Sequence, residues 1–357
     1  MSRFSAKSAF PWLVFVSACA SIGSPGAGDV DLPTGGAGPF RKLDGNETLG
    51  VAPFVLDDRT KLWHDPAVLA VDDAADAPAV FLYVAGTVAG KEVIARTRAN
   101  DGRSFFGGSV GTTPAVVLQA DGAEHLRGPS AARVAGKVLL YWSDGAGVRV
   151  ATSDDGLTFA KRPGYALAAA PPPSWESSPP EAPSVVVYPD GRVRMVYAAG
   201  GDLGEAESTD GLAFMRLGDA PIFGPSVAPD PATLAPGQKP PFDDGRVGDP
   251  CVLPHVTPAG RLHIRVLYTG TDVAGVTSIG LAARYGDTGP LSRQVQPVYA
   301  IGKGEKSPAF FEWSGGTLLY VAQDRAPSLD THYDAIAAGF SPANLRLPPA
   351  TDYADSP

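Results

Sequence analysis

Five short apolar runs of strand length recur along the chain, and each of them begins at a proline. The prolines are 54 to 67 residues apart, and the runs read HDPAVL, RGPSAA, EAPSVV, GDPCVL and KSPAFF, with Pro66, Pro129, Pro183, Pro250 and Pro308. A second apolar run follows each of them and carries a tyrosine near its end: Tyr83, Tyr141, Tyr197, Tyr268 and Tyr320. Tight-turn sequences such as PDGR at 189–192 separate the two runs. Each repeat therefore predicts two antiparallel strands joined as a hairpin.

A third element of small, alternating residues follows in every copy. In the first three copies it leads into an Asp-Gly bend and an aromatic residue, as in SDDGLTF at 153–159. A fourth strand is indicated in the first four copies by PAVVLQ, GYALAA, APIFG and QPVYAI. In the fifth copy the signal for this strand is weak. Five copies in this order predict an all-β, five-bladed β-propeller. A β-sandwich is the alternative, but it does not need the same order five times.

The predicted propeller spans residues 51–357, with blades that start near residues 63, 127, 181, 248 and 306. The segment before it has a different character. Arg3 and Lys7 precede an apolar stretch over residues 9–18, which ends in VSAC at Cys19. The stretch is shorter than the ~20 residues that span a membrane as a helix. It resembles a bacterial lipoprotein signal, and plain secretion is the alternative.

This signal predicts where the protein is found. We expect residues 1–18 to be removed as a signal peptide and Cys19 to be lipidated. Residues 19–50, rich in Gly, Pro and Ser, are then expected to form a flexible tether. The expected location is the cell envelope, at the outer membrane or cell surface, with a lipid anchor in the membrane.

Charge and cysteine content narrow the classes of partner. The formal net charge is −9, the pI is about 5.0 and no basic stripe is present, so nucleic acid is excluded as a partner. The 42 glycines and 35 prolines agree with a turn-rich all-β chain. With Cys19 lipidated, Cys251 has no cysteine to pair with, and a buried, unreactive thiol is expected there. We expect a monomer.

The residues just before the five prolines are the candidate site. The innermost strand of a propeller blade runs along the central channel, so residues at its start converge on one end of the axis. These positions hold Asp65, Gly128, the pair Glu181–Ala182, Asp249 and Ser307. Three carboxylates focused on one pocket suit glycoside hydrolysis. In that chemistry one carboxylic acid protonates the leaving oxygen, and a second carboxylate activates water or attacks the sugar.

The order of motifs resembles a known group of enzymes. DP opens the first blade, ExP opens the third, and SDDGxxF hairpins follow, as in the arabinanase–levansucrase–invertase superfamily, with glycoside hydrolase family 43 nearest. The resemblance implies that Asp65 is the general base and Glu181 the general acid. In family 43 a third carboxylate, an Asp before the proline of blade two, raises the pKa of the acid. Gly128 stands at that position here.

Several other residues are candidates beside these. Asp249 is a catalytic candidate that could replace the missing charge, and a ligand contact and a structural cap are its alternatives; Glu124 and His125 are another source of compensation.

Candidate substrate contacts are Trp63, His64, Trp175 and, because the family has a histidine in its last blade, His332. Trp175 and His332 are equally well explained by packing. The loop over residues 226–248, with Asp243 and Asp244, is a further candidate.

Two functions, and a third class, fit this pattern. The first is an envelope-anchored, family 43-like glycoside hydrolase that acts on an oligo- or polysaccharide, with inversion implied by the resemblance. The second is a non-catalytic propeller lipoprotein that binds glycan or protein, since one fold can host both. The third is a purely structural lipoprotein. No cofactor is indicated, and the histidines lack metal-ligand spacing. The resemblance leaves room for a structural calcium near the axis.

Overall fold

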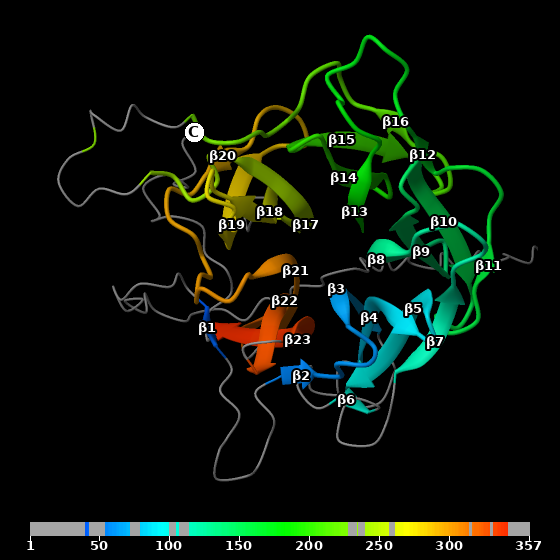
Figure 1. Ribbon diagram of the computed structural model, residues 1–357. Coiled ribbons are helices and arrows are strands. Elements are labelled where there is room, and N and C mark those ends of the chain that lie inside the picture. The colour runs from blue at the N-terminus through cyan, green and yellow to red at the C-terminus, as the bar shows by residue number, and fades with distance from the viewer. Residues whose placement is uncertain are drawn as a thin grey trace, which may run out of the picture.

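The chain folds as the predicted five-bladed β-propeller. The computed structural model describes residues 40–42, 54–71, 79–99, 105–106, 114–227, 234, 240–256, 261–313, 316–328 and 331–341. In these residues it contains strands only, in five sheets arranged around a central axis (Figure 1). The prediction of an all-β fold with five blades is confirmed. Within the same ranges, no helix is long and apolar enough to cross a membrane.

Each blade is an antiparallel sheet whose first strand is innermost. The inner strands are β3 (His64–Val71), β8 (Arg127–Val134), β13 (Glu181–Val187), β17 (Arg246–Val256) and β21 (Lys306–Trp313). The second strands are β4 (Ala79–Val88), β9 (Lys137–Ser143), β14 (Val193–Ala199), β18 (Leu262–Thr271) and β22 (Gly316–Ser328). The third strands are β5 (Lys91–Ala99), β10 (Gly147–Ser153), β15 (Asp202–Ser208), β19 (Thr277–Tyr285) and β23 (Thr331–Ser341).

The fourth position of the blades is filled by short segments. Beside the third strands lie β6 (Phe105–Phe106), β11 (Ala160–Lys161), β16 (Met215–Arg216) and β20 (Ser292–Arg293). The predicted fourth strands return to the other end of the third strand, as β7 (Ala115–Gln119) and β12 (Leu167–Ala168) in blades one and two. In blades three and four only single bridges remain, at Phe223 and Tyr299.

Blade five is completed by the N-terminal part of the chain. Both β1 (Arg41–Lys42) and β2 (Phe54–Leu56) pair antiparallel with β23, so the first and last strands of the propeller share one sheet. Phe40, just before β1, is 1% exposed and packs in the core between blades four and five. The predicted tether over residues 19–50 is therefore wrong for residues 40–42, which belong to the propeller; its other residues lie outside those that the structure describes.

Removing the Phe40 side chain is expected to destabilise the whole ring. Phe40→Ala deletes a fully buried aromatic group and should lower the free energy of unfolding by about 3–5 kcal/mol. Urea denaturation followed by tryptophan fluorescence measures this change. Met215→Ala in β16 is the matched control, since Met215 is largely exposed. A loss of less than about 1 kcal/mol in Phe40→Ala would mean that the ring closes without this residue.

Two sequence signals of the repeat connect neighbouring blades. The hydroxyl of Tyr83 in blade one donates to the Gly156 carbonyl of blade two at 2.8 Å, and Tyr141 donates to Gly211 of blade three at 2.8 Å. The bend itself is held by Ser153, whose Oγ accepts the Gly156 N–H at 2.8 Å. The tyrosine of one blade thus bonds the Asp-Gly bend of the next, which explains why both signals recur in the repeat.

All five inner strands share one irregularity at their start. The pairing with the second strand shifts register around the proline, as in a β-bulge. The residue before each proline has a φ between +44° and +54°: Asp65, Gly128, Ala182, Asp249 and Ser307. A bulge re-aims a side chain relative to a regular strand. The five positions therefore form a ring of equivalent sites at one end of the axis, here called the axial ring.

Candidate active site

Asp65 is the most strongly bonded member of the axial ring. Its Oδ1 accepts a hydrogen bond from Ser307 Oγ of blade five at 2.7 Å. Its Oδ2 accepts the Gly128 N–H of blade two at 3.0 Å and lies 2.9 Å from His64 Nδ1. The carboxylate thus joins three blades, and its side chain is only 19% exposed.

These partners keep Asp65 ionised. Burial alone would raise the pKa of its carboxyl, but the charge and hydrogen bond of His64, then the bonds from Ser307 and Gly128, hold the pKa well below its usual range. The same ion pair raises the pKa of His64 against the opposing effect of burial. At neutral pH, Asp65 is therefore a fixed negative charge on the axis.

Asp249 occupies the same ring in blade four but behaves differently. Its Oδ2 accepts a hydrogen bond from Thr269 Oγ1 at 2.9 Å, and that hydroxyl accepts the Ser307 N–H at 2.9 Å. Burial, and then the negative charge of Asp65, raise the pKa of Asp249. Two carboxylates that share one pocket resist simultaneous ionisation.

Glu181 lies one position before the axial ring, at the start of β13, and the space around this end of the axis is here called the funnel. Its side chain reaches solvent, but partial burial and then the charge of Asp249 raise its pKa, and Asp65 adds a smaller effect in the same direction. The guanidinium groups of Arg246 and Arg127 act against this rise. The raised pKa of Glu181 and the lowered pKa of Asp65 suit a proton donor and an ionised carboxylate in one pocket.

Gly128 explains why blade two lacks a carboxylate in this chain. A Cβ at this position would lie 2.8 Å from the Ala182 Cα of blade three, a backbone atom that cannot rotate away. Positive φ by itself is not the obstacle, because Asp65 and Asp249 adopt it with side chains in place. The close approach of two inner strands requires glycine here.

Restoring an aspartate at this position is therefore expected to harm the fold. Gly128→Asp and Gly128→Ala should both lower the free energy of unfolding by about 1–3 kcal/mol, because both introduce the Cβ that meets blade three. Thermal denaturation of the two variants measures this. Gly136→Ala is the control: Gly136 also has positive φ, but nothing lies within 4 Å of its Cβ position. Equal losses at Gly128 and Gly136 would show that strain, and not the contact with Ala182, decides.

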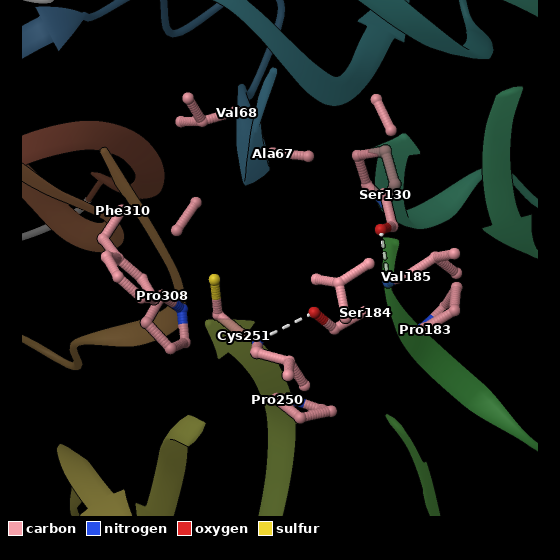
Figure 2. A pocket seen from close by; sticks show the side chains of 15 residues that line it. Ala67, Val68, Ser130, Pro183, Ser184, Val185, Pro250, Cys251, Pro308 and Phe310 are labelled. Atoms are coloured by element: carbon pink, nitrogen blue, oxygen red, sulfur yellow. Dashed lines mark hydrogen bonds between the residues drawn. The ribbon is translucent and has the colours of Figure 1, made fainter. Parts of the chain in front are cut away.

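A small cavity of about 50 Å³ continues along the axis beneath the carboxylates. Residues just after the ring in all five blades line its wall, among them four of the repeat prolines, Pro129, Pro183, Pro250 and Pro308 (Figure 2). Ser130 Oγ and Ser184 Oγ accept backbone N–H groups of the next blade at 2.9 Å each. The Cys251 thiol points into the cavity, and burial raises its pKa to about 12. The thiol is therefore protonated at neutral pH, which agrees with the expected unreactive cysteine.

Of the four candidate substrate contacts, only His64 lies beside a carboxylate of the axial ring. Trp63 is 1% exposed in the core between blades one and five, so its predicted contact with substrate is wrong. Trp175 is half-buried and stacks on Tyr197 with ring centroids 6.3 Å apart, which favours packing. His64 contacts Asp65 and belongs to the site. His332 is 60% exposed, and its Nδ1 lies 2.7 Å from Asp324 Oδ2 of the same blade.

The two aspartates of the loop over residues 226–248, Asp243 and Asp244, make different contacts. Asp243 is buried, accepts the Tyr268 hydroxyl at 2.7 Å and pairs with Arg293, so its role is structural. Asp244 accepts the Val273 N–H at 2.9 Å.

Glu124, the other candidate for compensation, contacts Lys161 Nζ at 2.6 Å. In the described residues, no group of three or more His, Cys, Asp or Glu side chains is arranged to hold a metal ion.

Sequence reasoning missed the groups that hold the carboxylates. Ser307 was seen only as the fifth member of the ring, although its hydroxyl binds Asp65 and its N–H binds Thr269. Thr269 lies near the end of a second strand, where no sequence signal marks it. Arg127 could have been found, since it stands two residues before its proline, as Glu181 does.

Comparisons with known proteins agree with this architecture. No family model and no curated protein matches the chain. A protein proposed to be a glycoside hydrolase, from Bacteroides ovatus, has a TM-score of 0.60 at 15% identity, covering 84% of this chain and 96% of its own. A thermostable family-43 glycoside hydrolase has a TM-score of 0.54 at 14% identity, over 78% and 89%.

An endo-arabinase from Bacteroides thetaiotaomicron is also similar, with a TM-score of 0.52 at 13% identity, over 82% of this chain and 98% of its own. The chain is therefore a five-bladed β-propeller that resembles glycoside hydrolase structures. At 13–15% sequence identity, these similarities show a shared fold and nothing more.

Proposed function

We propose that the protein is a glycoside hydrolase that cleaves an oligo- or polysaccharide in the funnel at the axial ring. The observation that carries the proposal is the pair of opposed shifts: the pKa of Glu181 is raised, and that of Asp65 is lowered, in one pocket. Two carboxyl groups with pKa values moved apart are what an acid–base pair requires. The glycoside hydrolases that share the fold add support from outside the chain.

The residues have distinct roles in this reaction. Glu181 donates its proton to the glycosidic oxygen as the bond to the anomeric carbon breaks. Asp65 accepts a proton from the water that attacks the same carbon, which gives inversion when that water fits between the two groups. Asp249 raises the pKa of Glu181, the effect that a carboxylate in blade two would otherwise supply. Gly128 contributes its N–H to Asp65.

We further propose that the enzyme is held at the cell envelope by a lipid on Cys19, following removal of residues 1–18. These residues lie outside those that the structure describes. Metabolic labelling with a fatty-acid probe tests this anchor in the wild type, and Cys19→Ser is its control. An unlabelled wild-type protein recovered in the medium would indicate plain secretion.

A panel of aryl arabinofuranosides, xylosides, mannosides and fructosides tests the activity. The wild-type protein should release the aryl alcohol from at least one of them, and the double variant Asp65→Asn/Glu181→Gln should not. A protein that binds oligosaccharides from the same panel but cleaves none would instead support the second function, a non-catalytic glycan-binding propeller. That alternative is favoured by the hydrogen bonds that saturate Asp65 and weaken it as a base.

A further inference from the structure

Two exposed arginines flank Glu181 from the neighbouring blades. Arg127 opens β8 two residues before its proline, the position that Glu181 holds in blade three. Arg246 opens β17, and the N–H of the next residue donates to the Gly201 carbonyl at 2.9 Å. Gly201 belongs to the hairpin after β14, the strand that pairs with Glu181. Both arginines therefore stand beside blade three at the mouth of the funnel.

Both guanidinium groups are exposed, and neither forms a close ion pair with a described residue. Arg127 is 62% exposed, and its nearest carboxylate oxygen, Glu92 Oε1, is 3.6 Å away and already contacts His125 Nδ1 at 3.0 Å. Arg246 Nε donates to Thr271 Oγ1 at 3.5 Å, and its positive charge acts on the carboxyl groups of Glu181 and Asp249.

The other basic groups of the same rim are paired. Lys306 Nζ lies 2.9 Å from Asp334, and His64 Nδ1 lies 2.9 Å from Asp65. Arg127 and Arg246 are thus the weakly paired positive charges at the mouth of the funnel, on either side of Glu181.

The positive charges of Arg127 and Arg246 oppose the role of Glu181 as a general acid. They favour the ionised form of Glu181, whereas proton donation to a leaving oxygen needs the protonated form. A ligand that brings its own negative charge would cancel this effect. Guanidinium groups bind carboxylates in a bidentate geometry and are suited to exposed, planar recognition of an oxyanion.

We propose that Arg127 and Arg246 form a subsite for an oxyanion carried by the glycan, the carboxylate of a hexuronic acid residue next to the cleaved bond. The subsite rests on the proposed function only for the position of that bond; binding itself does not require catalysis. A neutral sugar offers the two guanidinium groups no negative charge. An acidic sugar both gains two charge-assisted hydrogen-bonding partners and lets Glu181 keep its proton.

Binding of acidic oligosaccharides and their neutral counterparts tests the subsite. The probes are oligogalacturonates, oligomannuronates and aldouronic xylo-oligosaccharides, each beside its carboxyl-reduced form, titrated into the full-length protein by isothermal calorimetry. We expect at least one acidic probe to bind at least tenfold more tightly than its reduced form. The preference should fall at least fivefold in Arg127→Gln and in Arg246→Gln, and should vanish in the double variant.

The matched control is Arg162→Gln, an exposed arginine at the outer edge of blade two. It should leave the preference unchanged. Equal binding of acidic and reduced probes, no binding of any probe, or a preference that survives the double variant would overturn the subsite. So would competition by inorganic phosphate at equal concentration, since the anion would then be a free one.

The two proposals fail separately. Arginine-dependent binding without cleavage of any probe would retain the subsite and reject the hydrolase. Cleavage of neutral glycosides that ignores both arginines would do the reverse.

Discussion

Replacement of Glu181 by glutamine is expected to slow hydrolysis of glycosides with poor leaving groups by about 10²–10⁴-fold, the contribution of a general acid. Activated substrates such as 2,4-dinitrophenyl glycosides should lose far less, because their leaving group departs without a proton. Measuring kcat/KM over a series of aryl leaving groups separates the two effects. In the wild type the rate should depend weakly on leaving-group pKa, and in Glu181→Gln steeply.

The pH dependence gives an independent check on the same residue. The raised pKa of Glu181 means that its proton is present below that pKa and is lost as the pH rises through it. The wild type should therefore lose activity on the alkaline side, and Glu181→Gln should lack this limb. A uniform fall in rate for all leaving groups, with the alkaline limb intact, would assign the acid to another residue.

Asp65→Asn is expected to abolish most of the activity and to weaken the fold as well. Loss of the base should reduce kcat by about 10²–10⁴-fold. The amide also presents an NH₂ group to partners that now donate to a carboxylate, and His64 loses its counter-charge. A decrease of about 1–3 kcal/mol in the free energy of unfolding should follow at pH 7.

The stability difference should itself depend on pH. Because the folded-state pKa of Asp65 is lowered, the stabilisation it gives is complete above the unfolded-state pKa of about 3.9 and is lost as the pH falls toward the folded value. Denaturation at pH 7 and pH 3 should show the gap between wild type and variant narrowing. Asp154→Asn, an exposed carboxylate, is the control and should change stability by less than about 0.5 kcal/mol. A gap that is constant with pH would mean that Asp65 is not held ionised by its partners.

The blade repeat could be predicted from sequence because its signals are local. Each repeat has a proline near the start of its inner strand and a tyrosine on its second strand, and three of the five also have an Asp-Gly bend. These signals concern single blades or neighbouring blades, and their order along the chain is the same each time. Positions of Asp65, Glu181 and Asp249 on one axis followed from that order. The short closing strands could not be read, since Arg41–Lys42 and Phe54–Leu56 carry too few residues for any periodic pattern.

The parts of the site that sequence could not supply depend on distances between blades. Glycine at 128 reads as a lost carboxylate, yet its cause is the Ala182 Cα of another blade. Trp63 stands two residues before Asp65 and reads as a ligand contact, yet it faces the core. Ser307 and Thr269 lie in different strands, and their bonds to Asp65 and Asp249 exist only once the ring is assembled.

Closure of the ring by the N-terminal strands has a consequence for biosynthesis. The partner of β1 and β2 is β23, the last of the described strands to be synthesised. The earliest propeller strands must therefore remain unpaired until β23 has been made. Their exposed edges and Phe40 are open to wrong partners during that interval. Removal of β23 should for this reason also release β1 and β2 from the propeller.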